Sequence, residues 1–310
     1  MVLVTGPVMN GSSCVRCELR YRYRHLYSII EGVERSSFGR CSAAMHQSDE
    51  QGTQVQISLS GKVVVVTGGS SGIGLAIVRK FLECDAEKVI AVFRRTNIPD
   101  ELAACKAKYA DRLQYIHGDV ADESTAIQFT AAAVEGAGHL DVLVCNAAVS
   151  VVKAIHEHTP EEWDHVFNSN VKAVYWASRH VIPVMMRQNG GLILISGSIS
   201  GEVGIPTQGA YAPSKGALHQ MTRQMAVEYA GHNIRVNTIA CGTVDTPIVH
   251  RSAEASGKPE AYWDMLRDNH PIGRIAHVDE VASFYAFMAS EHASFFTGSV
   301  LMMDGGYTAR

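Results

Sequence analysis

The stretch Val63–Gly74, VVVVTGGSSGIG, decides the fold that this sequence predicts. Four consecutive valines are typical of a strand that is buried on both faces of a parallel sheet. After them, Gly68 permits a tight turn, Gly72 lets the backbone approach a ligand, and Gly74 lets a helix pack closely on the sheet. Because free amides at the start of that helix face negative charge, the stretch predicts a site for the pyrophosphate of a dinucleotide.

Strand and helix patterns alternate from Lys62 to the end of the chain. Short β-branched runs separated by helical patterns are typical of βαβ units, so they predict an α/β fold whose parallel sheet is covered on both faces. One helix is expected to begin after the cap Thr159 and to continue to about Gln188, with a kink or frayed last turn at Pro183. The expected strands are 62–67, 88–93, 112–117, 140–145, 191–196, 233–239 and 299–303.

Composition argues against several classes of protein. The 310 residues carry a formal net charge of −4 and only 19% of them are charged, so electrostatics give no reason to expect nucleic acid or a membrane surface as partner. The seven cysteines are scattered and odd in number, which favours a reducing compartment and a cytoplasmic location. Cys14 and Cys17 lack a second ligand pair, so no metal site is predicted. A small molecule is the expected partner.

Residues 1–58 differ from the rest of the chain and are expected to be a disordered N-terminal extension. Before Met45 there are six arginines and no lysine, with little sustained helical or strand period. Two alternatives stay open: an arginine-rich mitochondrial presequence, and a basic aromatic arm for RNA at Arg20–His25. We also consider Met45 as the working start, because the residues from there onward hold the whole predicted domain.

Three further motifs lie downstream of the glycine stretch: Asn146-Ala147-Ala148, Tyr211 followed by Lys215, and Asp304-Gly305-Gly306. Together and in this order, the four motifs resemble the short-chain dehydrogenase/reductase family over residues 59–310. The resemblance implies a doubly wound Rossmann fold with a seven-stranded parallel sheet and helices on both faces. It also implies a single domain that binds NAD or NADP and catalyses oxidoreduction.

The choice between the two cofactors depends on the end of the second expected strand. An acidic residue there would accept hydrogen bonds from the adenosine ribose and repel a 2′-phosphate. This chain has Phe93 instead, followed by Arg94, which can form a charge-assisted fork with a phosphate. NADP is therefore favoured, with NAD as the alternative. The residues expected to contact the cofactor, several of them implied by the resemblance, are Gly68, Ser70, Ser71, Gly72, Ile73, Gly74, Arg94, Asp119, Val120, Asn146, Lys215, Thr243, Val244 and Thr246.

Two small departures from the family pattern lie near this expected site. Ala148 stands where the family usually has glycine, and Cys241 stands where it usually has proline. Both replacements are small, and neither removes a reacting group.

Tyr211 and Lys215 lie four residues apart on an expected helix and therefore share one face. A nearby ammonium favours the phenolate, so Lys215 is expected to lower the pKa of Tyr211. The resemblance implies that Tyr211 is the general acid/base and that Lys215 also holds the nicotinamide ribose.

The resemblance assigns two more catalytic residues. Ser198 matches the serine that hydrogen-bonds the substrate oxygen, with Ser196 and Ser200 as competing candidates. Asn170 matches the asparagine that distorts its helix and links the lysine to a water chain, with Asn168 as its rival.

These features predict a cytoplasmic oxidoreductase that interconverts a secondary alcohol and a ketone by hydride transfer with NADP. The polar, helix-forming residues 247–272 are expected to form a mobile substrate lid. A homodimer or homotetramer is expected through the long helices. The alternative is a regulatory protein that binds NADP without turnover. The sequence leaves the identity of the alcohol or ketone and the physiological direction open.

Overall fold

The valine run forms β1 (Val63–Thr67), the third strand of the sheet, and all five of its residues are buried. It pairs in parallel with β2 (Lys88–Phe93) on one side and with β4 (Val142–Cys145) on the other. The computed structural model describes residues 56–310, which form one compact unit. The predictions that concern Met45, Cys14, Cys17 and the arginine-rich extension up to residue 55 lie outside the described residues.

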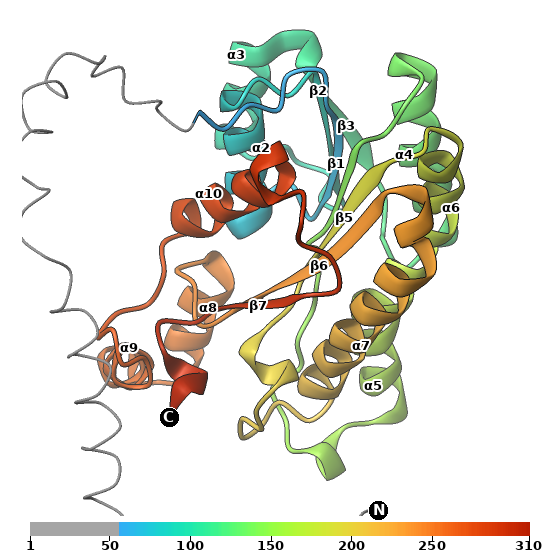
Figure 1. Cartoon of the computed structure of the whole chain (residues 1–310). Coiled ribbons are helices and arrows are strands. Elements are labelled where there is room, and N and C mark those ends of the chain that lie inside the picture. The colour runs from blue at the N-terminus through green and yellow to red at the C-terminus, as the bar shows by residue number, and fades with distance from the viewer. Residues whose placement is uncertain (1–55) are drawn as a thin grey trace, which may run out of the picture. The chain divides into compact units, whose positions relative to one another are not determined.

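The sheet has seven parallel strands in the order β3-β2-β1-β4-β5-β6-β7 (Figure 1). The remaining strands are β3 (Leu113–His117), β5 (Gly191–Ser196), β6 (Ile234–Cys241) and β7 (Val300–Met303). Each expected strand is present, and every boundary falls within two residues of the expected one. Because the strand order reverses between β1 and β4, the loops that follow these two strands diverge and leave the crevice in which such sheets bind ligands.

Helices cover both faces of the sheet, as predicted for a doubly wound Rossmann fold (Figure 1). On one face, α2 (Gly72–Glu83), α3 (Asp100–Tyr109) and α10 (Val278–Ala289) pack on the strands around Val64 and Val66. On the other face, α4 (Glu123–Ala137), α6 (Ala173–Arg187) and α7 (Tyr211–Tyr229) pack around Val63 and Val65. The alternation of a single strand thus divides the core into two layers. Short 3₁₀ turns are η1 (Ala110–Arg112), η2 (Ile155–Glu157), η4 (Ile199–Gly201), η5 (Ala230–His232), η6 (Glu291–Ala293) and η7 (Tyr307–Ala309).

The helix expected after Thr159 is present but is not regular throughout. It begins as α5 (Pro160–Phe167), passes through a π-helical turn, η3 (Asn168–Lys172), and continues as α6. Thr159 is the cap, as predicted: its side chain accepts a hydrogen bond from the Glu162 amide, and the Glu162 side chain accepts one from the Thr159 amide, which forms a capping box. The helix continues four residues beyond Pro183, to Arg187.

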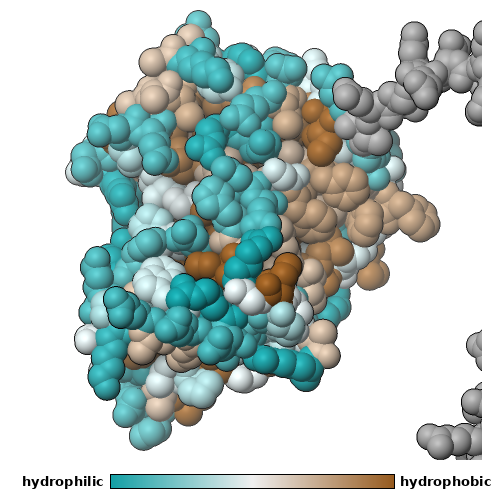
Figure 2. All heavy atoms as spheres, turned by 90° about the vertical axis from the view of Figure 1, so that its left-hand side faces the viewer, coloured by the Kyte–Doolittle hydropathy of each residue, from teal (hydrophilic) through white to brown (hydrophobic). Residues whose placement is uncertain are grey.

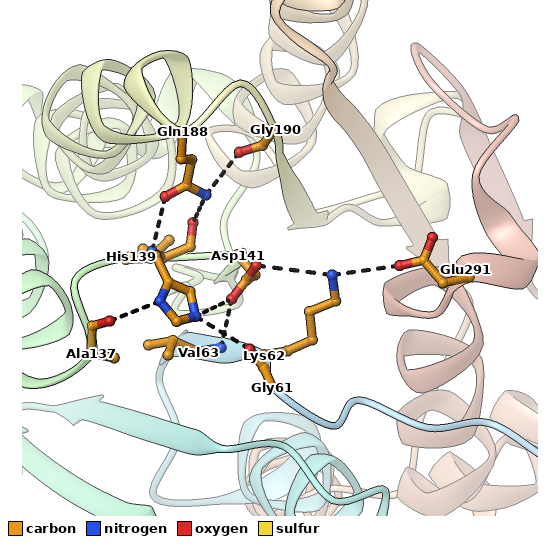
Figure 3. Close-up of polar contacts among 10 residues, drawn as sticks. Gly61, Lys62, Val63, Ala137, His139, Asp141, Gln188, Gly190 and Glu291 are labelled. Carbon is orange, nitrogen blue, oxygen red and sulfur yellow. Dashed lines mark hydrogen bonds and ion pairs between the residues drawn. The ribbon is translucent and has the colours of Figure 1, made fainter.

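A polar cluster joins the amino ends of the central strands, at the edge of the sheet opposite the expected site (Figure 3). Asp141, just before β4, accepts a hydrogen bond of 2.8 Å from the Val63 amide. Its carboxylate also lies 3.9 Å from the Lys62 ammonium, which in turn lies 3.5 Å from Glu291. These contacts hold the start of β1 to the segment that leads into β7.

His139 lies in the same cluster, and its neighbours there change its pKa. Its Nδ1 atom lies 2.9 Å from the Ala137 carbonyl oxygen, and its Nε2 atom lies 3.2 Å from both the Gly61 carbonyl and Asp141. Partial burial disfavours the charged ring, but the two carbonyls and Asp141 outweigh it, so the pKa of His139 is raised. The protonated imidazole can donate from both nitrogens and therefore favours the folded cluster.

The segment expected to be a lid forms α8 (Pro247–Ala255) and α9 (Pro259–Asp268). Only Ala253 in α8 and Leu266 in α9 are buried. On this side of the molecule hydrophilic side chains predominate, and hydrophobic ones gather toward one flank (Figure 2). Within residues 56–310, no helix has the length and apolar character needed to cross a membrane.

Candidate active site

The glycine stretch forms the turn from β1 into α2. Gly68 and Gly72 have φ values of +68° and +53°, a region that glycine enters without strain. A Cβ atom on Gly74 would lie only 2.2 Å from the Gly68 carbonyl oxygen, so the third glycine is required for the close approach of α2 to the turn. Ser71, at the N-cap position, makes no side-chain capping hydrogen bond within residues 56–310. The first amides of α2 therefore lack a capping side chain there and suit an anionic group.

Asn146 connects this turn to the neighbouring strands. Its side-chain amide donates to the Thr67 carbonyl at 3.1 Å, and its backbone amide donates to the Thr67 hydroxyl at 3.0 Å. Its carboxamide oxygen accepts from Ser196 at 3.3 Å, and Ser196 shares a 2.7 Å hydrogen bond with the Tyr285 hydroxyl. The carboxyl ends of β1, β4 and β5 are thus held together by one partly buried polar network, in which Tyr285 was not expected from the sequence.

Arg94 lies at the end of β2, as predicted, with 64% of its side chain exposed. Its guanidinium donates to Asp119, another expected cofactor residue, at 3.0 Å. Partial burial opposes ionisation of Asp119, but hydrogen bonds from the Ala121 amide and from Arg94 hold its pKa below the usual range. Phe93 is buried, and Val120 packs against the core beside α4.

Tyr211 and Lys215 lie in the first turns of α7 and share one face, as predicted. Lys215 is 2% exposed, and its ammonium donates to the Ser196 carbonyl at 2.7 Å and lies 5.4 Å from the centre of the Tyr211 ring. A buried cation is costly without a function or a partner, and its one carbonyl partner within residues 56–310 leaves two ammonium hydrogens for other acceptors.

The expected effect of Lys215 on Tyr211 is wrong for the structure described here. Burial raises the pKa of Tyr211 to about 12, and the Ser198 hydroxyl, which interacts with the phenol, offsets this only in part. Burial likewise lowers the pKa of Lys215 to about 8. The charge of the ammonium favours the phenolate, but removal of water from the phenol disfavours it and is the larger effect here.

Of the three candidate serines, Ser198 is the one that interacts with Tyr211. Ser196 instead binds Asn146 and Tyr285 through its hydroxyl. The Ser198 hydroxyl also accepts from the Ser200 amide at 3.1 Å and donates to the Ser200 hydroxyl at 3.0 Å. Ser200 therefore orients Ser198.

Asn170 lies in the π-helical turn and is 1% exposed, whereas its rival Asn168 is exposed. Its carboxamide accepts from the Val149 amide at 2.8 Å and donates to the Val149 carbonyl and the Ser214 hydroxyl, both at 3.0 Å. Because Ser214 precedes Lys215, Asn170 ties the loop after β4 to the helix that carries the lysine.

The segment after β6 brings the last expected cofactor residues to the same edge. Thr246 lies beside the glycine turn, since a Cβ on Gly72 would be 3.4 Å from its methyl group. Val244 is buried, and Thr243 donates its amide to the buried His270 imidazole at 3.1 Å. His270 Nδ1 donates in turn to the Leu266 carbonyl at 2.7 Å, so this histidine, missed in the sequence, joins the segment to the end of α9.

The structure therefore brings the glycine turn, Asn146, the Thr243–Thr246 segment and the Tyr211–Lys215 pair to the carboxyl edge of one sheet. Within residues 56–310 no group of three or more histidine, cysteine or acidic side chains is arranged to hold a metal ion. A Rossmann sheet with a glycine cradle for a pyrophosphate and a tyrosine beside a buried lysine defines a dinucleotide-dependent oxidoreductase.

Comparison with known proteins identifies the family. The family model described as enoyl-(acyl carrier protein) reductase matches residues 67–308. The 2-(R)-hydroxypropyl-CoM dehydrogenase of Xanthobacter autotrophicus is 36% identical over 252 residues, which cover 80% of this chain and 99% of that enzyme. The NADP-dependent (R)-specific alcohol dehydrogenase of Lentilactobacillus kefiri is 34% identical over 255 residues, covering 81% and 98%.

A solved structure gives the same result. The L-sorbose reductase of Gluconobacter frateurii, complexed with NADPH and L-sorbose, superposes with a TM-score of 0.78 at 32% identity and covers 82% of this chain and 99% of its own. The chain belongs to the short-chain dehydrogenase/reductase family, and it is an oxidoreductase.

Proposed function

We propose that this protein interconverts a secondary alcohol and a ketone with NADP, using Tyr211 as the general acid/base. The observation that carries the proposal is the convergence of Tyr211, Lys215 and Ser198. The phenol and the ammonium share one face of α7, and the serine interacts with the phenol. Both relatives named above are called dehydrogenases, which supports the same class of reaction.

The residues present fit a nicotinamide dinucleotide. Gly72 and Gly74 leave space that a Cβ would occupy, and the first amides of α2 lie there for a pyrophosphate. Asn146 and Thr246 flank this turn, and Lys215 has donors to spare for a ribose hydroxyl. When bound, the nicotinamide supplies or accepts the hydride.

Tyr211 donates a proton to the substrate oxygen or accepts one from it. Because burial keeps its pKa near 12, the phenol is protonated at neutral pH and can donate to a carbonyl oxygen as that oxygen gains negative charge. If its single hydroxyl hydrogen turns from Ser200 toward the substrate, Ser198 can donate a second hydrogen bond to the same oxygen. Lys215 stabilises the phenolate that remains after proton transfer, since its charge lies on the same buried face. In the reverse direction the phenolate removes the proton of an alcohol.

A preference for NADP over NAD is supported by the end of β2. Phe93 leaves no carboxylate for the ribose, and Arg94 lies exposed beside it. Asp119 holds the guanidinium, so a 2′-phosphate would have to compete with this carboxylate. We expect Arg94→Ser to raise the KM for NADPH about tenfold or more with little change for NADH, because a charge-assisted hydrogen bond contributes about 1.5–3 kcal/mol. Equal changes for both cofactors would contradict the assignment.

The deciding experiment follows absorbance at 340 nm with a panel of ketones and with both NADPH and NADH. Tyr211→Phe removes one oxygen atom and should lower kcat by at least about a hundredfold, a size typical of a general acid, while NADPH still binds. Full activity of Tyr211→Phe would refute the role of the phenol.

The alternative function is regulation by NADP binding without turnover. It would be favoured by tight NADPH binding together with no reaction on any substrate of the panel. The buried Lys215 beside Tyr211 argues against it, since cofactor binding alone does not require a phenol there.

Three further features belong to the proposal. The segment α8–α9 acts as a substrate lid. His250 on α8 contacts the Trp263 ring on α9 and pairs with Asp245, before α8, at 2.6 Å, so the two helices can move together. A homodimer or homotetramer is supported by exposed hydrophobic side chains at Tyr175 on α6 and Val227 on α7, and light scattering would test it. A cytoplasmic location agrees with the four free cysteines among residues 56–310, namely Cys84, Cys105, Cys145 and Cys241.

A further inference from the structure

A buried histidine without a role in the proposed chemistry lies on α7, one turn after Lys215. His219 is 1% exposed, and its Nδ1 atom lies 3.0 Å from the Glu202 carboxylate. Because a carboxylate only accepts, Nδ1 carries a hydrogen. The Nε2 atom is buried and has no hydrogen-bond partner within residues 56–310. Burial lowers the pKa of His219, although Glu202 opposes this, so the ring is neutral at neutral pH.

The turn that carries Ser198 lies directly on this ring. We call Gly197–Glu202 the serine turn. A Cβ on Gly201 would lie 2.4 Å from the His219 Cε1 atom, and one on Gly197 would lie 2.9 Å from Nε2. Both glycines therefore allow the backbone of the turn to contact the imidazole, which fills the space between the turn and α7.

Glu202 completes the attachment. Its amide donates to the Ile199 carbonyl at 2.9 Å and closes the turn, while its carboxylate reaches His219. Arg223 lies 3.8 Å from the same carboxylate, but this pair is exposed and contributes little. The Gly197 amide fixes the other end to the Ile239 carbonyl at 2.8 Å. Ser198 thus lies in a turn anchored to β6 at one end and to α7 at the other.

We propose that His219 is a positioning residue that, through Glu202, fixes the serine turn relative to the helix carrying Tyr211 and Lys215. The inference rests on the proposed function, in which the hydroxyls of Ser198 and Tyr211 converge on one substrate oxygen. These hydroxyls come from separate elements, so their separation depends on how the turn is held against α7. A displacement of about 1 Å can cost about a hundredfold in rate.

Matched substitutions at Glu202 test its contact with His219 with the least risk to folding, because the Glu202 side chain is partly exposed. Glu202→Gln keeps an oxygen that accepts from Nδ1, whereas Glu202→Leu removes it. We expect Glu202→Leu to lower kcat about tenfold or more and Glu202→Gln to stay within about threefold of wild type. The dissociation constant for NADPH, measured by fluorescence, should be unchanged in both variants, because the Glu202 side chain binds His219 and Arg223 and no hydrogen bond joins it to the glycine turn within residues 56–310.

The same comparison at the histidine uses His219→Phe and His219→Asn. Asparagine places an N–H near the position of Nδ1 and should restore most of the activity that phenylalanine loses. Thr222→Val is the control, since Thr222 is equally buried on α7 and bonds Thr238 on β6, and no hydrogen bond joins it to the serine turn within residues 56–310. It should keep kcat within about twofold of wild type.

A double-mutant cycle separates positioning from general damage. If Glu202 and His219 act through Ser198, Glu202→Leu should change kcat less than about twofold in a Ser198→Ala background. A full tenfold loss in that background would overturn the proposal, and so would wild-type kcat in Glu202→Leu. Failure of the proposed function gives a different result, because Tyr211→Phe would then retain activity. Amide hydrogen exchange adds a readout without substrate: residues 199–203 should exchange faster in Glu202→Leu than in Glu202→Gln.

Discussion

Replacing Gly74 with alanine should damage both stability and cofactor binding. The new Cβ would lie 2.2 Å from the Gly68 carbonyl oxygen and 2.5 Å from the Asn146 side-chain nitrogen, where real Cβ atoms stay beyond 3.0 Å. The start of α2 must therefore retreat by about 0.8 Å. Overpacking of this kind costs about 1–3 kcal/mol, which corresponds to a fall in Tm of roughly 3–10 °C for a domain of this size.

The same displacement moves the first amides of α2 away from their ligand. Loss of one hydrogen bond to a charged group costs about 1.5–3 kcal/mol, so NADPH affinity should fall at least about tenfold. Differential scanning fluorimetry and a fluorescence titration measure the two effects.

Gly216→Ala provides the matched control for this prediction. Gly216 also lies in a helix, but the nearest atom to its new Cβ is the Gly201 carbonyl oxygen at 3.5 Å, an ordinary contact. Alanine in a helix interior is more favourable than glycine by about 0.5–1 kcal/mol, so Tm should stay the same or rise. A Gly74→Ala protein with unchanged Tm and unchanged NADPH affinity would refute the packing argument.

Three other outcomes are expected. His139 has a raised pKa, so its contribution to stability is present at low pH and is lost as pH rises through that pKa. His139→Asn should therefore lower the free energy of unfolding, measured by urea titration, more at pH 5.5 than at pH 8.5. The difference should be less than about 1 kcal/mol because the group is partly exposed. A reversed order would contradict this assignment. His270→Phe leaves the Thr243 amide and the Leu266 carbonyl unpaired and should raise the dissociation constant for NADPH about fivefold or more, whereas an unchanged value would show that the segment holds itself. Alcohol oxidation needs the Tyr211 phenolate beside the Lys215 ammonium, so its rate should rise with pH from 6 to 8, approaching tenfold per unit, and level off above the lysine pKa of about 8. A flat oxidation profile between pH 6 and 8 in initial-rate assays would count against the phenol.

Local patterns in the sequence were sufficient for the fold and for much of the cofactor turn. The valine run of β1 predicts burial on both faces, and Gly68 and Gly72 predict a backbone with positive φ. Boundaries shifted where a strand merges into a loop, as at Leu140, which is buried but lies outside β4.

Contacts between distant residues could not be predicted in this way. Tyr285 reaches Ser196 across 89 positions, and His270 reaches Thr243 across 27, without any periodicity that would link them. The direction of the Tyr211 pKa was wrong for a related reason: desolvation depends on everything packed around the ring, and the spacing of Tyr211 and Lys215 reports only their shared face.

The π-helical turn at Asn168–Lys172 makes the length of this helix critical. Each residue of an α-helix advances the chain by about 100° around its axis. A deletion that converted the turn into ordinary α-helix would therefore rotate all of α6 relative to α5 by about that angle. Val174 and Val181 would leave the core, or Asn170 would lose its contacts with Val149 and Ser214. Natural and engineered variants of this helix should accordingly tolerate substitutions at its surface far better than the gain or loss of a single position.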